Sequence, residues 1–367
     1  MPGNTRPSIR LDKLEIINFK GIDRLTVDFP LPLMQEDPDV FALGSENGLG
    51  KTSILECVTL LYLASCITDG EKSPILPSME RESLFNPLDI LIRSGESSSI
   101  IEGLFSFGPS KFGVSLTIDR HSGLAVTGDT KKMRNSLKLS KPFRTDYAES
   151  ALDLILSASG FDSEPLILGP FIYFHSYRKV VESNPEFGMM VESDRLRRQL
   201  RMVRRGAITQ VSTFKVEILR SLMGRGELFE NVDSEESKSS LDTLNDLALQ
   251  FAGGEIAKLR PGANNTLEFR IQPKDGSPSF SFDGLSSGQK EIISTLFLVW
   301  KHTSVMPGIV LIDEPEMHLN AQWHKILVNK LVEMQPRNQY IIATHSEDVF
   351  ASVEPSHRML LRGSVMR

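Results

Sequence analysis

Hydrophobic residues in the first 128 positions fall into short runs in which apolar and polar residues alternate, a pattern typical of β-strands. The run at residues 40–43 is continuously apolar and leads into a glycine-rich segment. Directly after that segment, Ile54, Val58 and Leu61 recur at helical spacing, so we expect a helix over residues 51–64. Further strands are expected at residues 11–18, 25–29, 100–107 and 112–118.

The last third of the chain alternates apolar runs with helical patterns. Residues 309–313 and 340–344 are mostly apolar, which is typical of strands in a parallel sheet that is covered on both faces. Helical periodicity covers residues 287–300 and 321–334. Because strands alternate with helices here, the pattern predicts an α/β fold.

The middle of the chain has a different pattern. Residues 129–164 are polar and irregular, and they precede a strong strand pattern at 167–174 that ends in His175-Ser176-Tyr177-Arg178. Residues 189–222 have a helical, strongly basic pattern. An acidic, serine-rich loop is expected at residues 233–240, followed by another helix.

These changes in pattern suggest a division into two parts. We expect a discontinuous head formed by residues 1–128 and 252–367, and an inserted, mostly helical lobe formed by residues 129–251. The inserted lobe contains a cluster of arginines that either binds a phosphate backbone or an acidic partner, or forms a solvated helix face paired with nearby carboxylates. The arginines of this cluster are Arg195, Arg197, Arg198, Arg201, Arg204 and Arg205.

Composition sets broad limits on the class of protein. The chain has 367 residues, with 41 Lys and Arg against 47 Asp and Glu, so its bulk charge of −6 does not indicate nucleic-acid binding. The two cysteines, Cys57 and Cys66, lie in an apolar segment and are expected to be reduced thiols. We find neither a secretory signal nor an apolar stretch long enough to cross a bilayer, so we expect a cytoplasmic protein without membrane contact.

A glycine-rich segment lies between the apolar run at residues 40–43 and the expected helix. It reads Ser45-Glu46-Asn47-Gly48-Leu49-Gly50-Lys51-Thr52, with Ser45 where the P-loop pattern has glycine. Gly48 and Gly50 let backbone N–H groups turn towards phosphates, and the start of the following helix adds a positive dipole. We expect Lys51 to contact the β- and γ-phosphates of a nucleotide and the Thr52 hydroxyl to bind Mg²⁺.

Two adjacent carboxylates, Asp313 and Glu314, close one of the apolar runs. Ligands bind at the carboxyl ends of strands in open α/β sheets. Because adjacent carboxylates repel each other unless a cation lies beside them, we expect Asp313 to contact Mg²⁺ and Glu314 to orient and deprotonate the attacking water. His345 follows the other apolar run, where it can hydrogen-bond the γ-phosphate or that water.

A serine-rich segment, Leu285-Ser286-Ser287-Gly288-Gln289, opens the helix expected at residues 287–300. Ser286 suits the N-cap position, and hydroxyl and free N–H groups at a helix start bind anions. Each feature has a plainer interpretation when it is taken alone: a capped amphipathic helix, a glycine turn, acidic residues that begin a loop, or a packing histidine. Their occurrence together and in this order favours a nucleotide site.

These motifs resemble those of an ABC-type ATPase head of the SMC, RecF and OLD (overcoming lysogenisation defect) kind. Residues 45–52 are similar to Walker A, 285–289 to the ABC signature, 309–314 to Walker B, and His345 to the switch histidine. The opening Leu14-Glu15-Ile16-Ile17-Asn18-Phe19-Lys20-Gly21 resembles the "LxIxNF(K/R)" start of these heads, whose basic residue lies near the nucleotide. Residues 313–319 are similar to the "DEPExHL" of compact prokaryotic members.

The resemblance implies a fold, an activity and an assembly. It implies an α/β, ABC-type P-loop head with a mixed sheet, interrupted by a mainly helical insert, that hydrolyses ATP with Mg²⁺. Two heads of that family pack head to tail, and the signature serine of one completes the ATP site of the other, so we expect a dimer or a higher even oligomer. The expected catalytic residues are Glu314, His345 and Lys51; the Mg²⁺ ligands are Thr52 and Asp313; and the ATP contacts are Lys20, Asn47, Gly48, Gly50, Lys51, Thr52, Ser53, Ser286, Ser287 and Gly288.

One part of the family pattern has no obvious counterpart. The chain contains no glutamine between Lys51 and Gln199, so the glutamine of the family's Q-loop cannot be placed. Either a residue within 86–93 takes that role, or none does.

The resemblance narrows the choice among members of the family. A transporter subunit is disfavoured because Lys51 and Leu285 lie far apart, and SMC proper is excluded because the insert is too short for a long coiled coil. OLD nucleases have a Toprim domain after the head, and this chain ends at Arg367. We therefore expect an ATPase that regulates or scaffolds a separate effector, a nuclease or toxin, in a prokaryotic anti-phage defence module.

Two other functions stay open at this point. The first is a RecF-like DNA-maintenance ATPase whose ATP-bound dimer clamps DNA, with the arginine cluster at residues 195–205 as its DNA contact. The second is a nucleotide-locked structural module in which Ser45 has slowed turnover. DNA binding and a steady-state ATPase rate would discriminate between them.

Overall fold

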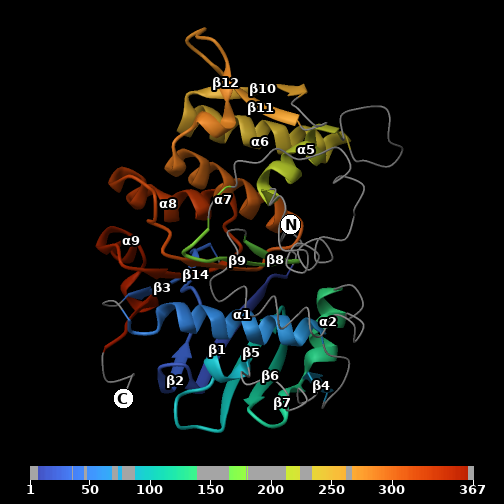
Figure 1. Ribbon diagram of the computed structural model, residues 1–367, viewed down its shortest axis with the longest axis vertical. Coiled ribbons are helices and arrows are strands. Elements are labelled where there is room, and N and C mark those ends of the chain that lie inside the picture. Colours follow the sequence, from blue (N-terminus) through green and yellow to red (C-terminus); the bar gives the residue numbers. More distant parts are fainter. Residues whose placement is uncertain are drawn as a thin grey trace.

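The fold is built in layers, with two large sheets enclosing one helix (Figure 1). The computed structural model describes residues 7–34, 36–44, 48–67, 73–76, 87–138, 165–178, 180, 212–223, 234–261 and 267–362. No helix within these ranges is long and apolar enough to cross a membrane.

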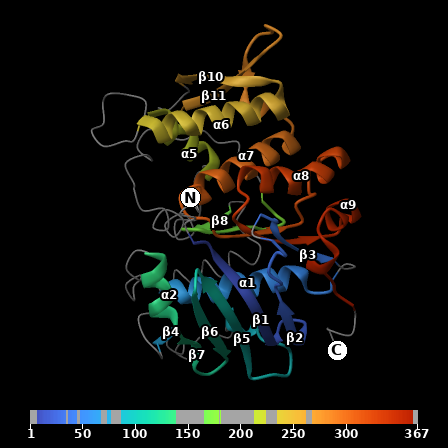
Figure 2. The same ribbon diagram turned by 180° about the vertical axis from the view of Figure 1, so that it is seen from behind.

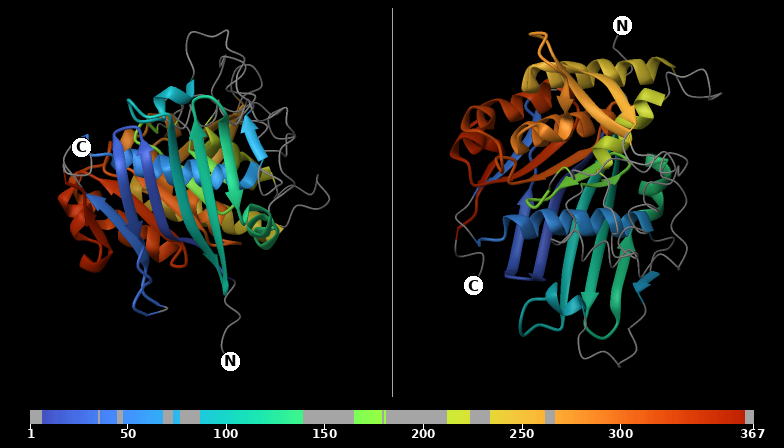
Figure 3. Two further views of the ribbon diagram at one scale, coloured as in Figure 1. Left: turned by 90° about the horizontal axis from the view of Figure 1, so that it is seen from below. Right: turned by 45° about the horizontal axis from the view of Figure 1, so that its top comes forward.

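The first layer is an antiparallel sheet with the strand order β2-β1-β5-β6-β7-β4. Alternate residues of β1, β5 and β6 are buried, because one face of the sheet covers the core and the other is more exposed. Figure 3 (left) shows this sheet from its outer side. The strands are β1 (Ile9–Phe19), β2 (Ile22–Asp28), β4 (Ser73–Leu76), β5 (Ser98–Phe107), β6 (Ser110–Asp119) and β7 (Gly123–Gly128).

Helix α1 (Lys51–Ile67) lies between the two large sheets (Figure 1). It contacts β1, β5 and β6 of the antiparallel sheet as well as strands of the second sheet. Residues 54–65 are buried throughout, because a helix enclosed on both sides needs apolar residues around its whole circumference. The helix predicted at residues 51–64 is confirmed.

The second large sheet is mostly parallel and has the order β15-β3-β14-β13-β9-β8. The pairs β3–β14, β14–β13 and β13–β9 are all parallel. The predicted mixed sheet and α/β class are confirmed. The strands are β3 (Asp39–Gly44), β8 (Leu166–Leu168), β9 (Phe171–Phe174), β13 (Ile309–Asp313), β14 (Gln339–Thr344) and β15 (Arg358–Leu360).

Both faces of the parallel sheet are buried, and successive residues of a strand enter different cores. Leu311 and Ile341 pack towards α1, whereas Val310 and Ile342 pack towards the helices on the other face. This double burial explains why the sequence of these strands is continuously apolar.

A helical layer and a small antiparallel sheet cover the other face of the parallel sheet (Figure 2). Helix α7 contacts α5, α6 and α8, and α6 contacts β10. Residues 267–362 supply most of this layer. Its elements are α5 (Thr213–Met223), α6 (Ser234–Ala252), α7 (Ser287–Thr303), α8 (Ala321–Met334), α9 (Glu347–Ala351), β10 (Gly254–Pro261), β11 (Leu267–Pro273) and β12 (Phe280–Ser281).

Buried polar contacts join the two large sheets. The Gln339 side chain accepts a hydrogen bond from the Leu11 amide at 2.7 Å and donates one to the Leu11 carbonyl at 2.8 Å. Arg10 pairs with Asp12 at 2.8 Å and with Asp39 at 3.0 Å. Because the Gln339 amide and the Arg10 guanidinium are buried and hydrogen-bonded, the contacts of Gln339 with Leu11 and of Arg10 with Asp39 fix β1 against the parallel sheet.

The structure differs from the expected division near the start of the inserted lobe. The apolar run at residues 167–174 forms two strands, β8 and β9, which pair antiparallel across Gly169 and Pro170. Because β9 also pairs with β13, these strands lie in the parallel sheet, whereas the expected division assigns them to the inserted lobe. The remaining division of the chain stays a proposal.

Two helices occupy segments that were expected to be irregular. Helix α2 (Thr130–Leu137) begins where a polar, irregular stretch was expected, and it packs against α1. The acidic, serine-rich segment expected as a loop at residues 233–240 forms the first turns of α6 from Ser234 onwards. Both expectations were wrong because short or polar helix segments lack apolar periodicity.

Candidate functional site

The glycine-rich segment links β3 to α1, as a phosphate loop does. Gly48 and Gly50 have φ angles of 79° and 83°, in the left-handed region that glycine adopts without strain. The Ile54 amide donates to the Gly50 carbonyl at 3.0 Å, so the helix begins at the loop. The expected ATP contact Asn47, like Ser45, lies outside the described residues.

Thr52 and Asp313 meet across this loop, and together they suit Mg²⁺. The Thr52 hydroxyl donates to Asp313 Oδ2 at 2.9 Å, and Asp313 is fully buried. Asp313 Oδ1 is buried without a hydrogen-bond partner among the described residues. Burial raises the pKa of Asp313 to about 7, against the opposing effect of the Thr52 hydrogen bond. A hydroxyl and a buried, unsatisfied carboxylate oxygen fit the all-oxygen coordination of Mg²⁺.

Three residues predicted to act in catalysis lie together at one edge of the parallel sheet. Lys51 Nζ is 2.9 Å from His345 Nε2, and His345 Nε2 is 3.6 Å from Glu314 Oε1. Lys51 opens α1, Glu314 follows β13 and His345 follows β14. Burial lowers the pKa of Lys51, and the nearby carboxylates, Glu314 first among them, oppose this shift.

The backbone around Glu314 is held in an uncommon conformation. Glu314 has a φ of 47°, and its amide donates to the Ala343 carbonyl at 2.8 Å. A non-glycine residue in the left-handed region is strained by about 1–3 kcal/mol, and such residues cluster at functional sites. The bond to Ala343 ties the end of β13 to the end of β14.

Glu316 fixes the loop that bears His345. Its carboxylate accepts hydrogen bonds from the amides of His345 at 2.6 Å and Ser346 at 3.0 Å, and from the Thr344 hydroxyl at 2.7 Å. Sequence reasoning gave Glu316 no role, although it lies within the segment similar to "DEPExHL". Its position two residues after the Asp313–Glu314 pair was the available signal.

The serine-rich segment opens α7 as predicted. Ser286 is the N-cap: its hydroxyl accepts from the Gln289 amide at 3.3 Å, and the Gln289 side chain accepts from the Ser286 amide at 3.0 Å. Ser286 and Ser287 are exposed, whereas Gly288 is buried. A Cβ atom on Gly288 would lie 2.4 Å from the His318 carbonyl oxygen, so a larger residue cannot fit without a backbone shift.

Arg178 connects three elements of the site, and the sequence did not identify it. Its guanidinium is buried, pairs with the Glu291 carboxylate on α7, and donates to the carbonyls of Asp313 at 2.6 Å and Glu314 at 3.1 Å. It also donates to the His175 carbonyl at 3.1 Å. The signal available in the sequence was the run of polar residues that ends the 167–174 strand pattern.

The carboxyl end of β9 is relevant to the Q-loop glutamine of the family, for which the sequence offered no counterpart. Phe174 pairs with Ile312, so His175 follows β9 next to the end of β13. Of the range 86–93, residue 86 lies outside the described residues, and two of the others contact the end of β1: the Leu91 carbonyl accepts from the Lys20 amide at 3.0 Å, and Ile92 bridges to Phe19.

Lys20 is held by a carboxylate of α1. Its Nζ lies 2.5 Å from Glu56 Oε2, and its φ of 48° turns the chain between β1 and β2. Burial raises the pKa of Glu56, and the Lys20 ammonium opposes this shift. The expected contacts of Lys20 and Ser53 with ATP stay predictions.

Comparisons with known proteins agree with this geometry. The sequence model of a protein family described as "AAA domain, putative AbiEii toxin, Type IV TA system" matches residues 46–351. The chain is similar to the "Retron Ec83 probable ATPase" of Escherichia coli, with 23% identity over 409 residues that cover 96% of this chain and 72% of that protein. It also shares 40% identity over 55 residues with "Septu protein PtuA" of Bacillus mycoides, which covers 15% of this chain and 8% of that protein.

A solved structure supports the fold. The structure described as "Crystal structure of the SmcHead bound to the C-winged helix domain of ScpA" aligns with a TM-score of 0.52 and 15% identity, over 94% of this chain and 92% of that chain. At this level of identity the likeness shows the fold alone.

Proposed function

Because this chain belongs to the AAA domain family and is an SMC-like ATPase related to retron and Septu ATPases, we propose that two copies bind ATP head to tail and thereby control a separate effector protein. The observation that supports this proposal is the meeting of Lys51, Asp313, Glu314 and His345 at one edge of the parallel sheet. Two kinds of group needed for phosphoryl transfer, cationic and carboxylate, are thus in place.

The residues of this chain divide the chemistry among them. Lys51 and the backbone of Gly48 and Gly50 bind the phosphates, and Thr52 and Asp313 would hold Mg²⁺, which neutralises phosphate charge when it is bound. Glu314 accepts a proton from the attacking water, whose oxygen bonds to the γ-phosphorus as the bond to the β-phosphate oxygen breaks.

His345 is placed to join this step. It lies between Lys51 and Glu314, so it can hydrogen-bond the γ-phosphate on one side while it orients the Glu314 carboxylate on the other. Glu316 keeps the His345 backbone in place while the side chain changes partner.

The exposed start of α7 supports the head-to-tail arrangement. Ser286 and Ser287 present hydroxyls to solvent next to the free N–H groups of a helix start, which together form an anion-binding surface. In the proposed dimer this surface meets the γ-phosphate held by the partner subunit. His175, next to the end of β13, takes the place of the Q-loop glutamine in this proposal.

The effector is proposed by analogy with the relatives. Their names place them in retron and Septu systems, and we propose a nuclease or toxin as the separate protein that this ATPase regulates or scaffolds in the cytoplasm. The alternative of a RecF-like DNA clamp depends on the arginine cluster at residues 195–205, which lies outside the described residues, so it stays a prediction. Salt-dependent DNA binding that is lost when these arginines are replaced by Ala would favour that alternative.

The variant Glu314→Gln tests the proposal. We expect kcat to fall by about 10²- to 10⁴-fold, the range for loss of a general base, while ATP binding persists. Size-exclusion chromatography with light scattering should then detect an ATP-bound dimer. The matched control Glu333→Gln changes an exposed carboxylate of α8 and should keep the parent rate.

Two results would contradict the proposal. One is a parent protein that hydrolyses no ATP at any Mg²⁺ concentration. The other is a Glu314→Gln variant that binds ATP but stays monomeric at high protein concentration.

Ser287→Arg should bind ATP as a monomer and fail to dimerise, because Arg occupies the space that the partner's phosphates would need.

A further inference from the structure

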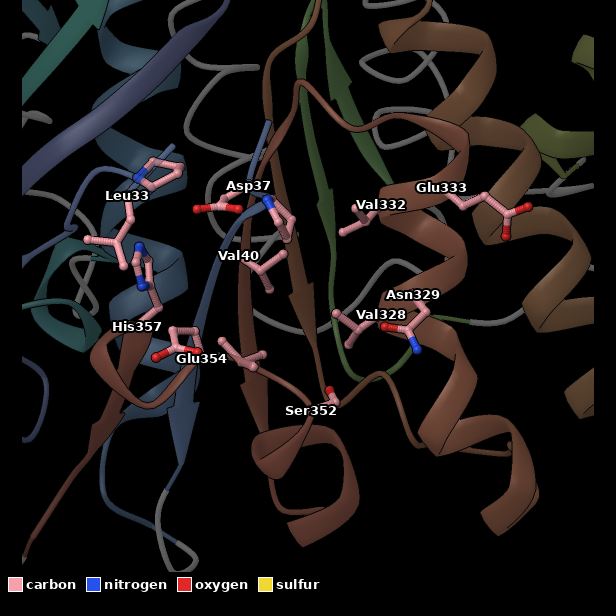
Figure 4. Close-up of a pocket in the computed structure, with 13 residues that line it drawn as sticks. Leu33, Asp37, Val40, Val328, Asn329, Val332, Glu333, Ser352, Glu354 and His357 are labelled. Atoms are coloured by element: carbon pink, nitrogen blue, oxygen red, sulfur yellow. The ribbon is translucent and has the colours of Figure 1, made fainter. Parts of the chain in front are cut away.

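A groove lies away from the ATP site, on the side of the parallel sheet where β3 begins (Figure 4). It has a volume of about 510 Å³, within the range of ligand pockets. The loop between β2 and β3, the start of β3, α8 and the segment after α9 enclose it. The acidic groove is defined by Pro32, Leu33, Asp37, Pro38, Val40, Val328, Asn329, Val332, Glu333, Ser352, Val353, Glu354 and His357.

The floor of the acidic groove is apolar. Val40, Val328 and Val353 are each only 4% exposed and form part of the core. The neighbouring loop presents large apolar side chains to solvent, with Leu33 at 85% and Met34 at 70% exposed. A hydrophobic hollow beside exposed apolar residues and rimmed by polar ones is typical of a protein-binding surface.

Of carboxylate, ammonium and guanidinium groups, only carboxylates line the groove. Asp37, Glu333 and Glu354 are exposed, and the lining contains neither Lys nor Arg. Lys330 on α8 pairs with Glu333 at 2.7 Å and neutralises part of this charge. Glu354 has no ion pair with another described residue, and the described partner of the Asp37 carboxylate is the Met34 amide at 2.9 Å.

We propose that the acidic groove binds a basic, amphipathic segment of a separate protein, whose aliphatic or aromatic side chains enter the hollow while its Lys and Arg residues face the carboxylates. Charge complementarity favours this occupant over an anionic lipid surface or a nucleic acid, which the carboxylates would repel. A symmetric contact between two copies is disfavoured, because it would place the same carboxylates opposite one another.

The position of the groove suits a regulatory partner. Val40 is the second residue of β3, and the glycine-rich segment follows the other end of this strand, roughly 13 Å away at about 3.3 Å per residue. Helix α8 follows the loop of Glu314, and α9 follows His345. A bound segment therefore contacts β3, α8 and the segment after α9, which are continuous in sequence with the loops of the ATP site, while it leaves that site open. The inference deepens the proposed function, since the segment would belong to the effector.

A random 12-residue peptide phage library, panned on the immobilised full chain without nucleotide, tests the inference. We expect selected peptides to be enriched in Lys and Arg together with Leu, Ile, Met or Phe. The selected peptides, synthesised with a fluorescent label, should bind at least tenfold more weakly to Leu33→Glu than to the parent in anisotropy titrations. Val305→Glu changes another exposed apolar residue, at 63% exposure and outside the groove, and should bind like the parent.

A charge-reversal variant and an ATPase measurement complete the experiment. The double variant Asp37→Lys, Glu354→Lys should select acidic peptides and reject the basic ones. ATP hydrolysis by Leu33→Glu should match the parent, so a failure of binding is distinguished from a failure of the ATPase proposal. Enrichment of acidic or uncharged peptides, unchanged binding to Leu33→Glu, no enrichment at all, or self-association that Leu33→Glu abolishes would each overturn the inference.

Discussion

Replacing Arg178 by Met tests what holds the catalytic loops in place. Arg178 and Glu291 are 4% and 5% exposed and form a buried ion pair. The guanidinium also donates to the carbonyls of Asp313 and Glu314. Because removal of one partner leaves the other charge buried and unpaired, we expect the free energy of unfolding to fall by about 3–5 kcal/mol.

The double variant Arg178→Met, Glu291→Leu separates stability from catalysis. Apolar replacement of both partners of a buried ion pair is often neutral, so the double variant should recover the part of the stability loss that comes from the unpaired Glu291 carboxylate, and a deficit of about 1–3 kcal/mol should remain from the carbonyls that lose their donor. The carbonyls of Asp313 and Glu314 would still lack their donor. A hydrogen bond from a charged donor contributes about 1.5–3 kcal/mol. If the hydrogen bonds from Arg178 position the loop of Asp313 and Glu314 for the transition state, kcat of the double variant should stay about 10- to 100-fold below that of the parent.

Urea unfolding followed by circular dichroism gives the stabilities, and a steady-state ATPase assay at saturating ATP gives kcat. The matched control is Arg24→Met, which removes an exposed arginine paired with Glu15 and should change stability by less than about 1 kcal/mol. Full recovery of kcat in the double variant would refute a positioning role for Arg178. A stability loss below about 1 kcal/mol in Arg178→Met would refute the buried pair itself.

Three further predictions concern Asp313 and Gly288, which are buried in the site. Because the pKa of Asp313 is raised to about 7, a proton should compete with Mg²⁺ for its carboxylate below that pH. The apparent Mg²⁺ affinity, measured in ATPase titrations, should therefore fall about tenfold per pH unit between pH 7 and pH 5. An affinity that stays constant over this range would contradict the prediction. Without Mg²⁺, the folded state keeps a proton that the unfolded carboxyl, at its usual pKa of 3.8, has lost, so the contribution of Asp313 to stability should decrease from about pH 4 to about pH 7 in urea titrations. Gly288→Ala should lower the rate of ATP hydrolysis and keep ATP binding, because its Cβ would lie 2.4 Å from a backbone oxygen. The control Gly284→Ala should behave like the parent, because its Cβ would lie 3.6 Å from the nearest side chain.

The residues that follow apolar strands were predictable from the sequence. Lys51, Glu314 and His345 each come just after an apolar run or the loop that continues it, and parallel strands end at one edge of a sheet. Their proximity follows from that rule without any knowledge of side-chain contacts. The α/β class was predictable for the same reason, since continuous apolar runs require burial on both faces.

Residues that act through distant contacts were not predictable. Arg178 and Glu291 are 113 positions apart, and no periodicity links a polar residue after a strand to a carboxylate within a helix. The hairpin of β8 and β9 was missed because Gly169 and Pro170 interrupt an apolar run for only two residues. Local patterns report which face of an element is buried, but not which buried charges are partners.

The same groups that would bind ATP and Mg²⁺ are joined to one another in this conformation. Lys51 contacts His345 at 2.9 Å, Thr52 donates to Asp313, and Lys20 pairs with Glu56. Because a buried lysine loses hydration, the charged phosphate oxygens are stronger partners for Lys51 than an imidazole nitrogen is. Phosphate binding should therefore draw Lys51 away from His345, which then lies beside Glu314 with a nitrogen free for the γ-phosphate or the attacking water. In the proposed mechanism, phosphate binding by Lys51 and the positioning of His345 beside Glu314 are therefore coupled by the same change of contacts.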